Sequence, residues 1–209
     1  MIWLTSDLHL GHEAAIRLSG RPFSSVEEMN RCLVENYNQL VTGRDTVYIL
    51  GDLTYRIKEE EANELVSRLN GKKILIRGNH DRVNYDASLF TEICDLKKLR
   101  YQHCKFILMH YLLAEWEGKE HYSIHLHGHI HSKGRYNQEN IRRGIRQYDV
   151  GVDANHFEPV SLDELVRLFA GAPLISPVDR HNYDETAGET VEVRNHLSGT
   201  SQTAEKWRE

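Results

Sequence analysis

The feature that most constrains this chain is a repeated arrangement in which a short apolar, β-prone run stops at an Asp, Asn or His residue, usually beside a glycine. Five segments share it: Asp7-Leu8-His9, Gly51-Asp52, Gly78-Asn79-His80-Asp81, His110 and His127-Gly128-His129-Ile130-His131. In open α/β sheets the loops at the carboxyl ends of strands meet at one edge, where binding sites are built. The five segments are therefore expected to converge on one polar site.

The apolar runs alternate with helical patterns. Strands are predicted over residues 2–6, 46–50, 73–77, 105–109, 122–126 and 148–152. Helices are predicted over residues 24–41, 58–70 and 161–169. In the first helix Ser25 with Glu28 resembles a capping box, and Met29 and Leu33 fall on one apolar face. Strands and helices alternate early and strands dominate later, which predicts an α/β protein with helices on the outer faces of sheets.

Length and composition predict one domain followed by a tail. The 209 residues suit a single domain with a sizeable core, which we place at residues 1–175. From Ser176 onward the sequence becomes polar with few large apolar groups, so residues 176–209 are expected to form a polar C-terminal extension. The alternation Thr190-Val191-Glu192-Val193 predicts one short edge strand within it.

Apolar patterning, cysteine usage and charge restrict the class of protein. No uninterrupted apolar stretch approaches the roughly 18 residues of a membrane helix, and the start of the chain lacks a secretory signal pattern. The odd set Cys32, Cys94 and Cys104 has no Cys-x-x-Cys pair, which suits three buried free thiols in a reducing compartment. We therefore predict a cytoplasmic protein without a membrane partner. The net charge of −5 does not favour non-specific nucleic-acid binding.

The residue types at the five strand ends indicate a metal site. Oxygen and imidazole ligands without sulfur suit Mn, Fe, Ni or Zn rather than a structural thiolate zinc site. Asp7 with His9, and His129 with His131, are spaced by two, so extended backbone would direct each pair to one side. Glycines 51, 78 and 128 would let the backbone turn sharply and keep space beside the metals open.

Counting the candidate ligands predicts two ions. The candidates are Asp7, His9, Asp52, Asn79, His110, His129 and His131. Seven are too many for one tetrahedral ion, and they suit two ions that share one carboxylate. Because only Asp7 and Asp52 carry negative charge, such a site would favour an anionic substrate.

The five motifs occur in an order that resembles the calcineurin-like metallophosphoesterase superfamily. The specific part is Gly-Asn-His-Asp together with Gly-His-x-His and Asp-x-His, spread over residues 7–131. Residues 6–12 and Arg21-Pro22-Phe23 resemble the small bacterial and phage single-domain members. The resemblance implies a four-layer α-β-β-α sandwich of two mostly mixed β-sheets flanked by helices.

The resemblance also implies a role for each motif residue. Asp7, His9 and His131 would hold one ion, and Asn79, His110 and His129 would hold the other. Asp52 would bridge the two ions. His80 would be the catalytic residue that protonates the leaving oxygen or stabilises charge on phosphorus. Many relatives carry a second aspartate three residues after the bridging one; here Tyr55 stands there, which leaves Asp81 or a backbone carbonyl to orient His80.

The reaction implied by the resemblance is metal-dependent hydrolysis of phosphodiesters or phosphomonoesters by in-line attack of a hydroxide held at two divalent ions, manganese among the candidates. The expected partner is a small phosphate ester such as a nucleotide. A nuclease is the first alternative, although it would need a basic track. A non-catalytic metal-binding scaffold is the second, and the intact ligand set with His80 argues against it. The sequence leaves the oligomeric state open.

Several further polar residues have two interpretations. His12 suits either the start of a helix or a contact with substrate phosphate, and His127 suits either a core position or support of a ligand. Arg21 and Arg56 are candidate phosphate contacts, with solvated surface side chains as the favoured alternative. Asp153 suits either a strand-end turn or the orientation of a metal-bound histidine.

Overall fold

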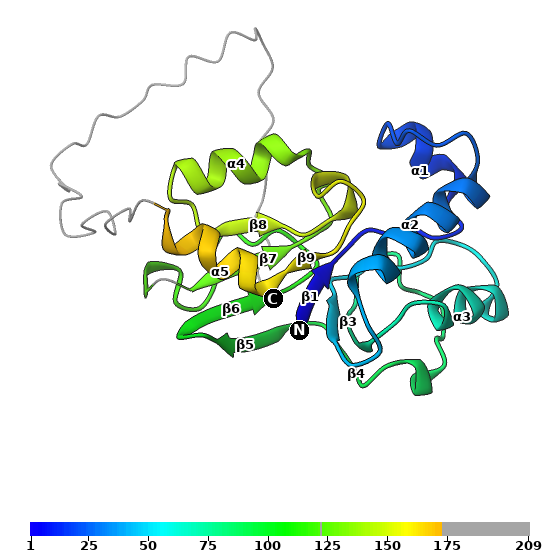
Figure 1. Ribbon diagram of the computed structural model, residues 1–209, viewed down its shortest axis with the longest axis horizontal. Coiled ribbons are helices and arrows are strands. Elements are labelled where there is room, and N and C mark those ends of the chain that lie inside the picture. The colour runs from blue at the N-terminus through cyan, green and yellow to red at the C-terminus, as the bar shows by residue number, and fades with distance from the viewer. Residues whose placement is uncertain (122, 173–209) are drawn as a thin grey trace, which may run out of the picture. The chain divides into compact units, whose positions relative to one another are not determined.

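The computed structural model describes residues 1–121 and 123–172, which contain two β-sheets (Figure 1). The five-stranded sheet has the order β4-β3-β2-β1-β9, and the four-stranded sheet has the order β5-β6-β7-β8. The strands of the first sheet are β1 (Ile2–Thr5), β2 (Thr46–Ile49), β3 (Lys72–Ile76), β4 (Glu92–Cys94) and β9 (Val160–Ser161). Those of the second are β5 (Lys97–Tyr101), β6 (Cys104–Leu108), β7 (Ile124–His127) and β8 (Gln147–Asp149).

Five α-helices accompany the sheets in the described part of the chain. They are α1 (Glu13–Leu18), α2 (Val26–Leu40), α3 (Glu59–Ser67), α4 (Gly134–Arg142) and α5 (Leu162–Ala170). Short 3₁₀ turns are η1 (Ala87–Leu89), η2 (Lys119–His121) and η3 (Val152–Ala154). None of the helices in residues 1–121 and 123–172 combines the length and apolar character needed to cross a membrane.

Both sheets are mixed, and this sets where the loops meet. In the first sheet β1, β2, β3 and β4 pair in parallel and β9 pairs antiparallel with β1. In the second, β6, β7 and β8 are parallel and β5 is antiparallel to β6. The carboxyl ends of the parallel strands therefore point to one edge within each sheet. This arrangement confirms the predicted α/β class and its two mixed sheets.

The outer face of the first sheet is covered by α2 and α3. Met29 and Leu33 of α2 and Leu65 of α3 share one buried apolar cluster with Val47 and Ile49 of β2. Helix α2 begins as predicted, because the Ser25 hydroxyl accepts the backbone N–H of Glu28 at 3.1 Å. The Glu28 carboxylate, however, accepts the backbone N–H of Ser24 instead of that of Ser25, so the reciprocal capping bond falls one residue earlier than expected.

The two sheets pack against each other through a second apolar cluster. Leu4 and Leu50 from the first sheet and its loop meet Phe106 and Leu126 from the second, and Phe169 of α5 joins them. On the other side of the second sheet α4 lies along β8 (Figure 1). Helices α2 and α3, two sheets and α4 thus make the four layers that the resemblance implies. The inter-sheet core fixes the relative position of loops that come from both sheets.

Strands β4 and β5 and helix α4 are not among the predicted elements. Helix α4 could not be predicted from the spacing of apolar residues, because its buried residues are Asn137 and Asn140. Asn137 exchanges two hydrogen bonds with the backbone of Asp149, at 2.8 and 2.9 Å, and so attaches α4 to β8 by polar contacts. In β5 the charged residues mask the alternation of apolar and polar side chains by which a strand is predicted. The strand predicted over 148–152 ends earlier, at Asp149, because η3 begins at Val152.

Two further expectations concern the tail and the thiols. The chain divides into residues 1–175 and 176–209, and the second part, with the strand predicted over 190–193, lies outside the described residues. The interpretation of that part as an extension stays a prediction. Cys32, Cys94 and Cys104 are free, but each is partly exposed. The expectation that all three are buried was wrong.

Candidate metal centre

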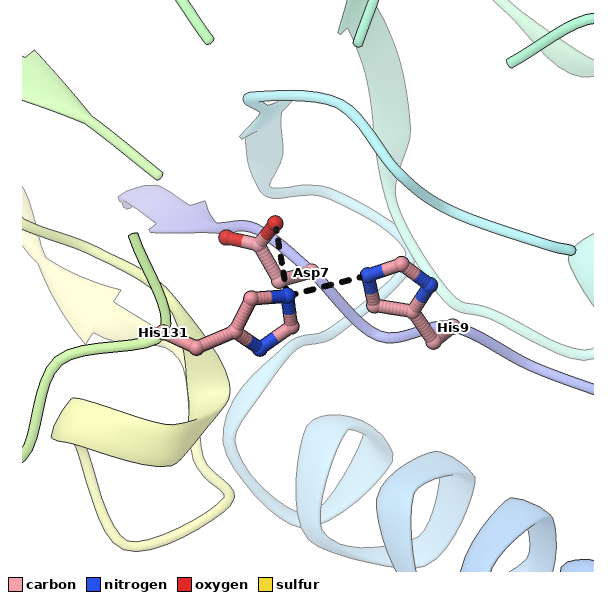
Figure 2. Close-up of side chains that lie close together, drawn as sticks. All are labelled: Asp7, His9 and His131. Atoms are coloured by element: carbon pink, nitrogen blue, oxygen red, sulfur yellow. Dashed lines mark hydrogen bonds and ion pairs between the residues drawn. The ribbon is translucent and has the colours of Figure 1, made fainter. Parts of the chain in front are cut away.

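The loops that follow β1, β2, β3, β6 and β7 carry the seven predicted ligands and bring them to one place. One group consists of Asp7, His9 and His131, whose ligand atoms lie within 4.8 Å of one another. Figure 2 shows the His131 ring facing both other side chains. His131 Nε2 lies 3.2 Å from His9 Nε2 and 3.8 Å from Asp7 Oδ1.

The second group lies around His110. Asp52, His110 and His129 place ligand atoms within 4.8 Å of one another. His110 Nε2 lies 3.2 Å from His129 Nδ1 and 3.0 Å from the Asn79 amide oxygen. Asn79 therefore belongs to this group as well.

Asp52 connects the two groups. Its Oδ2 atom lies 3.6 Å from His9 Nε2 and 3.5 Å from His110 Nε2. Its other oxygen, Oδ1, accepts the backbone N–H of His80 at 2.8 Å, which holds the carboxylate in this orientation. One carboxylate oxygen placed between ligand atoms of both groups is the arrangement that a bridging ligand requires.

Five of the seven side chains are presented from left-handed backbone. The φ angles are 57° at Asp7, 51° at His9, 52° at Asp52, 71° at His129 and 46° at His131. Non-glycine residues seldom adopt this region, and each such residue costs about 1–3 kcal/mol. The sequence predicted extended backbone at the two pairs of candidate ligands that are spaced by two. That prediction was wrong, because all four of these residues are left-handed, and this conformation turns their loops towards the site.

Hydrogen bonds between neighbouring loops hold this strained backbone. The Asp7 N–H donates to the Gly51 carbonyl at 3.0 Å, and the His9 N–H donates to the Asp52 carbonyl at 2.9 Å. The loop after β1 therefore continues to pair with the loop after β2 beyond the end of the strands. This pairing fixes the spacing between the first ligand group and the bridging carboxylate.

Three glycines allow the loops to approach the ligands closely. A Cβ atom on Gly78 would lie 2.2 Å from Asp52 Oδ1, and one on Gly128 would lie 2.4 Å from Asp7 Oδ2. A Cβ atom on Gly51, where φ is +89°, would lie 2.5 Å from His110 Nδ1. Space beside the ligands, more than a sharp turn, is what excludes a side chain at Gly78 and Gly128.

Partners behind the imidazoles fix which nitrogen faces the site. His131 Nδ1 lies 2.8 Å from Asp153 Oδ2, and His110 Nδ1 donates to the Leu50 carbonyl at 2.7 Å. His9 Nδ1 lies 3.2 Å from His12 Nδ1. Each contact leaves Nε2 directed into the site, as in metal sites where a carboxylate or carbonyl orients a ligating histidine.

The donor set fits a cation. Asp7 Oδ1 is buried and has no hydrogen-bond partner among the described residues, whereas Oδ2 accepts the His129 backbone N–H at 2.9 Å. A buried polar atom without a partner costs free energy, which a coordinated cation would remove. Burial raises the pKa of Asp7 to about 7 and lowers the pKa of His9 to about 2. Burial also lowers the pKa of His129, so these imidazoles are neutral, the form that binds metal.

His80 lies at the edge of the site beside Tyr55. His80 Nε2 is 3.9 Å from Asp52 Oδ2, and its side chain is 36% exposed. The Tyr55 ring meets the His80 ring edge-on at 4.7 Å and stacks on the His12 ring at 3.7 Å. Tyr55, which stands three residues after Asp52, thus contacts His80 through its ring.

Asp81 does not take over the orientation of His80. Its carboxylate accepts backbone N–H groups of Asp52 and Gly78, both at 2.8 Å, and of Leu53 at 2.9 Å. It therefore ties the loop after β2 to the loop after β3. The contacts of Asp81 are therefore with the backbone of these two loops.

Arg21 departs from both of its interpretations. It is 4% exposed and donates to the backbone carbonyls of Asp7 and Leu8 and to the Asp153 carboxylate. It is neither a surface side chain nor free to contact phosphate. No pattern in the sequence indicates this burial, apart from the position of Arg21 close to the first motif.

The remaining polar residues are resolved as follows. His12 precedes α1 at the N-cap position, but its side chain caps nothing and turns to His9 and Tyr55. His127 is fully buried, with its ring nitrogens near the Gly128 carbonyl and the Tyr136 hydroxyl. Arg56 is exposed beside Tyr55. Sequence reasoning missed Asp149, whose buried carboxylate accepts the N–H and hydroxyl of Ser132 and so anchors the loop that carries His131.

The fold and this geometry define a metal-binding α/β sandwich protein. Residues 1–184 match the model of the calcineurin-like phosphoesterase family. The chain belongs to that family. Membership indicates metal-dependent hydrolysis of phosphate esters as the general chemistry.

Two relatives and one solved structure resemble the chain over most of its length. An uncharacterized protein of Methanocaldococcus jannaschii is 36% identical over 184 residues, which cover 85% of this chain and 96% of the relative. The gene 66 protein of Mycobacterium phage L5 is 29% identical over 182 residues, covering 73% and 86%. The crystal structure of a protein of unknown function from Aquifex aeolicus matches with a TM-score of 0.64 at 26% identity, covering 80% of this chain and 98% of that one.

Proposed function

We propose that this chain hydrolyses small phosphate esters, phosphodiesters in preference to monoesters, with two divalent metal ions. The observation that carries the proposal is Asp52 Oδ2, which lies between His9 of one ligand group and His110 of the other. Asp7, His9 and His131 would hold one ion, Asn79, His110 and His129 the other, and Asp52 both. The nitrogen and oxygen donors suit Mn, Fe, Ni or Zn, and Mn is the first to test.

The two ions, when bound, would neutralise charge on the phosphate and acidify water, which is the usual chemistry of two-metal sites. The protein's own contribution is to fix the donors. The paired loops after β1 and β2 set the spacing of the two groups, and the buried partners of His131 and His110 fix their ring orientation.

His80 is proposed as the general acid. In the reaction the oxygen of water forms a bond to phosphorus and its proton passes to solvent, while the ester P–O bond breaks. The leaving oxygen takes the proton from His80 Nε2. That atom faces Asp52 at 3.9 Å, and the His80 side chain is 36% exposed, so a substrate can approach the ring. A general acid in this role contributes a factor of about 10²–10⁴.

A metal-dependent assay tests the proposal. Metal-stripped protein is supplied with Mn²⁺ and given bis(p-nitrophenyl) phosphate, p-nitrophenyl phosphate and single-stranded DNA. We expect turnover on the diester above that on the monoester, and loss of turnover on stripping. His80→Ala should reduce turnover about 10²-fold or more while metal content stays near two ions per chain. Unchanged turnover in that variant removes His80 from its role.

The same assay separates the alternatives. A nuclease would prefer DNA, which the net charge of −5 does not favour. A metal-binding scaffold would hold two ions and turn over none of the three substrates. His121→Ala provides the matched control, since this histidine lies in η2 and belongs to neither ligand group. The small phosphate ester as partner and the cytoplasm as location stay predictions.

A further inference from the structure

A cavity of about 430 Å³ opens beside the first ligand group. The residues that line it include three histidines of the site, His9, His80 and His131, together with Leu18, Ile130 and Lys133. Its volume falls within the roughly 300–1,000 Å³ typical of small-molecule sites. Because ligand residues line it, a group bound there is continuous with a phosphate bound at the metal centre.

Two of the residues that line the cavity are apolar and exposed. Leu18 is 68% exposed and Ile130 is 36% exposed. Apolar side chains that line a cavity together with a few polar groups are the usual composition of a small-molecule site. The two come from distant parts of the chain, the end of α1 and the loop after β7, and line the same cavity.

The basic residue in the cavity is already engaged. Lys133 Nζ donates to the Ser19 carbonyl at 2.7 Å and lies 3.7 Å from Asp153 Oδ1. These contacts use part of the hydrogen-bonding capacity of the ammonium group, so the cavity is not built around a free lysine. The His12 ring also lines the cavity and offers a planar surface, since it is held by stacking on Tyr55 at 3.7 Å. This combination favours a flat, uncharged group.

His80 shows which part of the substrate the cavity receives. A general acid must reach the leaving oxygen, and His80 lines this cavity. The leaving group of the ester therefore extends into it. On the side of the second ligand group, Tyr111 is 41% exposed and places its ring 4.8 Å from the His129 ring. A diester would have its second substituent on that side.

Resting on the function proposed above, we propose that Leu18 and Ile130 form a specificity wall that selects phosphate esters whose leaving group carries a flat ring of aryl or nucleobase size. The two residues touch the leaving group and are not catalytic. They contribute affinity by removing apolar surface from water when the ring binds.

Binding of phosphonates, which cannot be hydrolysed at the P–C bond, tests the wall apart from catalysis. Affinities of phenylphosphonate, hexylphosphonate and methylphosphonate are measured by calorimetry on the Mn²⁺-loaded protein. We expect phenylphosphonate to bind about tenfold more tightly than methylphosphonate, a difference of about 1.4 kcal/mol. Hexylphosphonate has the same number of carbons without a ring, so it should bind more weakly than phenylphosphonate.

Leu18→Ser and Ile130→Ser should each remove most of the phenyl preference and leave the affinity for methylphosphonate unchanged. Leu96→Ser is the matched control, because Leu96 is 41% exposed and does not line the cavity. Adenosine 5′-monophosphate against ribose 5-phosphate distinguishes a nucleobase from other aryl groups. All three positions are exposed enough for the variants to fold.

The outcomes separate this inference from the proposed function. Hydrolysis without any ring preference, or a ring preference that both serine variants retain, overturns the specificity wall and leaves the hydrolase proposal standing. A ring preference that the serine variants lose, in a protein that hydrolyses no ester, supports the wall and overturns the hydrolase. Equal binding of hexylphosphonate and phenylphosphonate overturns the selection of a flat ring.

Discussion

The guanidinium of Arg21 and the carboxylate of Asp153 form an ion pair that solvent does not reach, with Nη2 and Oδ2 2.8 Å apart and both side chains 0% exposed. The same Oδ2 atom lies 2.8 Å from His131 Nδ1. The Asp153 carboxylate thus connects Arg21, which precedes α2, to the proposed metal ligand His131, which follows β7. Hydrogen bonds and ionic contacts at Asp153 hold its pKa well below its usual range against the effect of burial.

Replacing Arg21 should destabilise the fold. In Arg21→Met the Asp153 carboxylate loses its buried partner, and breaking a buried pair in this way typically costs about 3–5 kcal/mol. Urea denaturation measures the change in the free energy of unfolding. Arg17→Met, which alters an exposed arginine on α1, is the control and should change it by less than about 0.5 kcal/mol. Equal stability of the two variants would show that the Arg21–Asp153 pair contributes nothing to the free energy of unfolding.

Asp153→Asn should weaken metal binding in addition to destabilising the fold, because it also removes the charged partner of Arg21. The amide keeps the size of the side chain but loses the charge that orients His131 Nδ1, and loss of such a partner typically lowers metal affinity about 10–100-fold. Calorimetric titration with Mn²⁺ measures it. Asp163→Asn removes a carboxylate that contacts Tyr101 and Gln102, away from both ligand groups, and should bind metal as the wild type does. Wild-type affinity in Asp153→Asn contradicts the orienting role.

The parts of this molecule that follow simple periodic patterns were predictable from the sequence. Buried β-prone runs gave β1, β2 and β3, and the apolar face of Met29 and Leu33 gave α2. Helix α4 could not be found in that way, because Asn137 attaches it to β8 through backbone hydrogen bonds. A polar residue on a polar helix gives no signal that it is buried.

The gathering of the seven ligand candidates was also predictable, but the way the backbone achieves it was not. Strand-end positions follow from the order of apolar runs and polar residues. The left-handed conformations of Asp7, His9 and Asp52 depend on hydrogen bonds between loops that come together only in the folded chain. The buried position of Arg21 has the same origin, since its partners lie on the loop after β1 and on η3. Contacts between distant segments carry no local pattern.

Tyr55 should act on His80 through its ring. Tyr55→Phe keeps the edge-on contact at 4.7 Å and the stacking on His12, and we expect turnover within about twofold of wild type. Tyr55→Ala frees the His80 ring, and kcat should fall several-fold while KM and metal content change little. Steady-state kinetics and metal analysis distinguish the two. A fall of equal size in both variants would assign the role to the hydroxyl instead of the ring.

The pH dependence of the metal-free protein should report Asp7. Burial raises the folded-state pKa of Asp7 to about 7 from the ordinary 3.8, so the folded chain retains a proton that the unfolded chain has lost between these values. Stability therefore falls as pH rises across this range, and Asp7 no longer adds to the fall above about pH 7. Asp7→Asn mimics the protonated form. Its Tm minus the wild-type Tm should increase from pH 5 to 8, and a constant difference would contradict the raised pKa.

Manganese should reverse that trend. A cation beside Asp7 favours the carboxylate, so the rise in Tm on adding Mn²⁺ should grow as pH increases through 7 in the wild type. In Asp7→Asn the rise in Tm on adding Mn²⁺ should be small at every pH, because the amide lacks the negative charge with which Asp7 would bind the cation. An equal rise in both proteins would place the ion elsewhere.

Gly78 should tolerate no side chain, and its replacement tests the close approach of the loops to the bridging carboxylate. In Gly78→Ala the added Cβ atom would lie 2.2 Å from Asp52 Oδ1 and 2.6 Å from the Asp52 backbone nitrogen, so either Asp52 or its loop must move. We expect metal content to fall below one ion per chain, because Asp52 contributes to both groups. Gly43→Ala, where the added atom meets nothing within 4 Å, should retain two ions. Two ions in Gly78→Ala would mean that the bridging carboxylate is not needed where the structure places it.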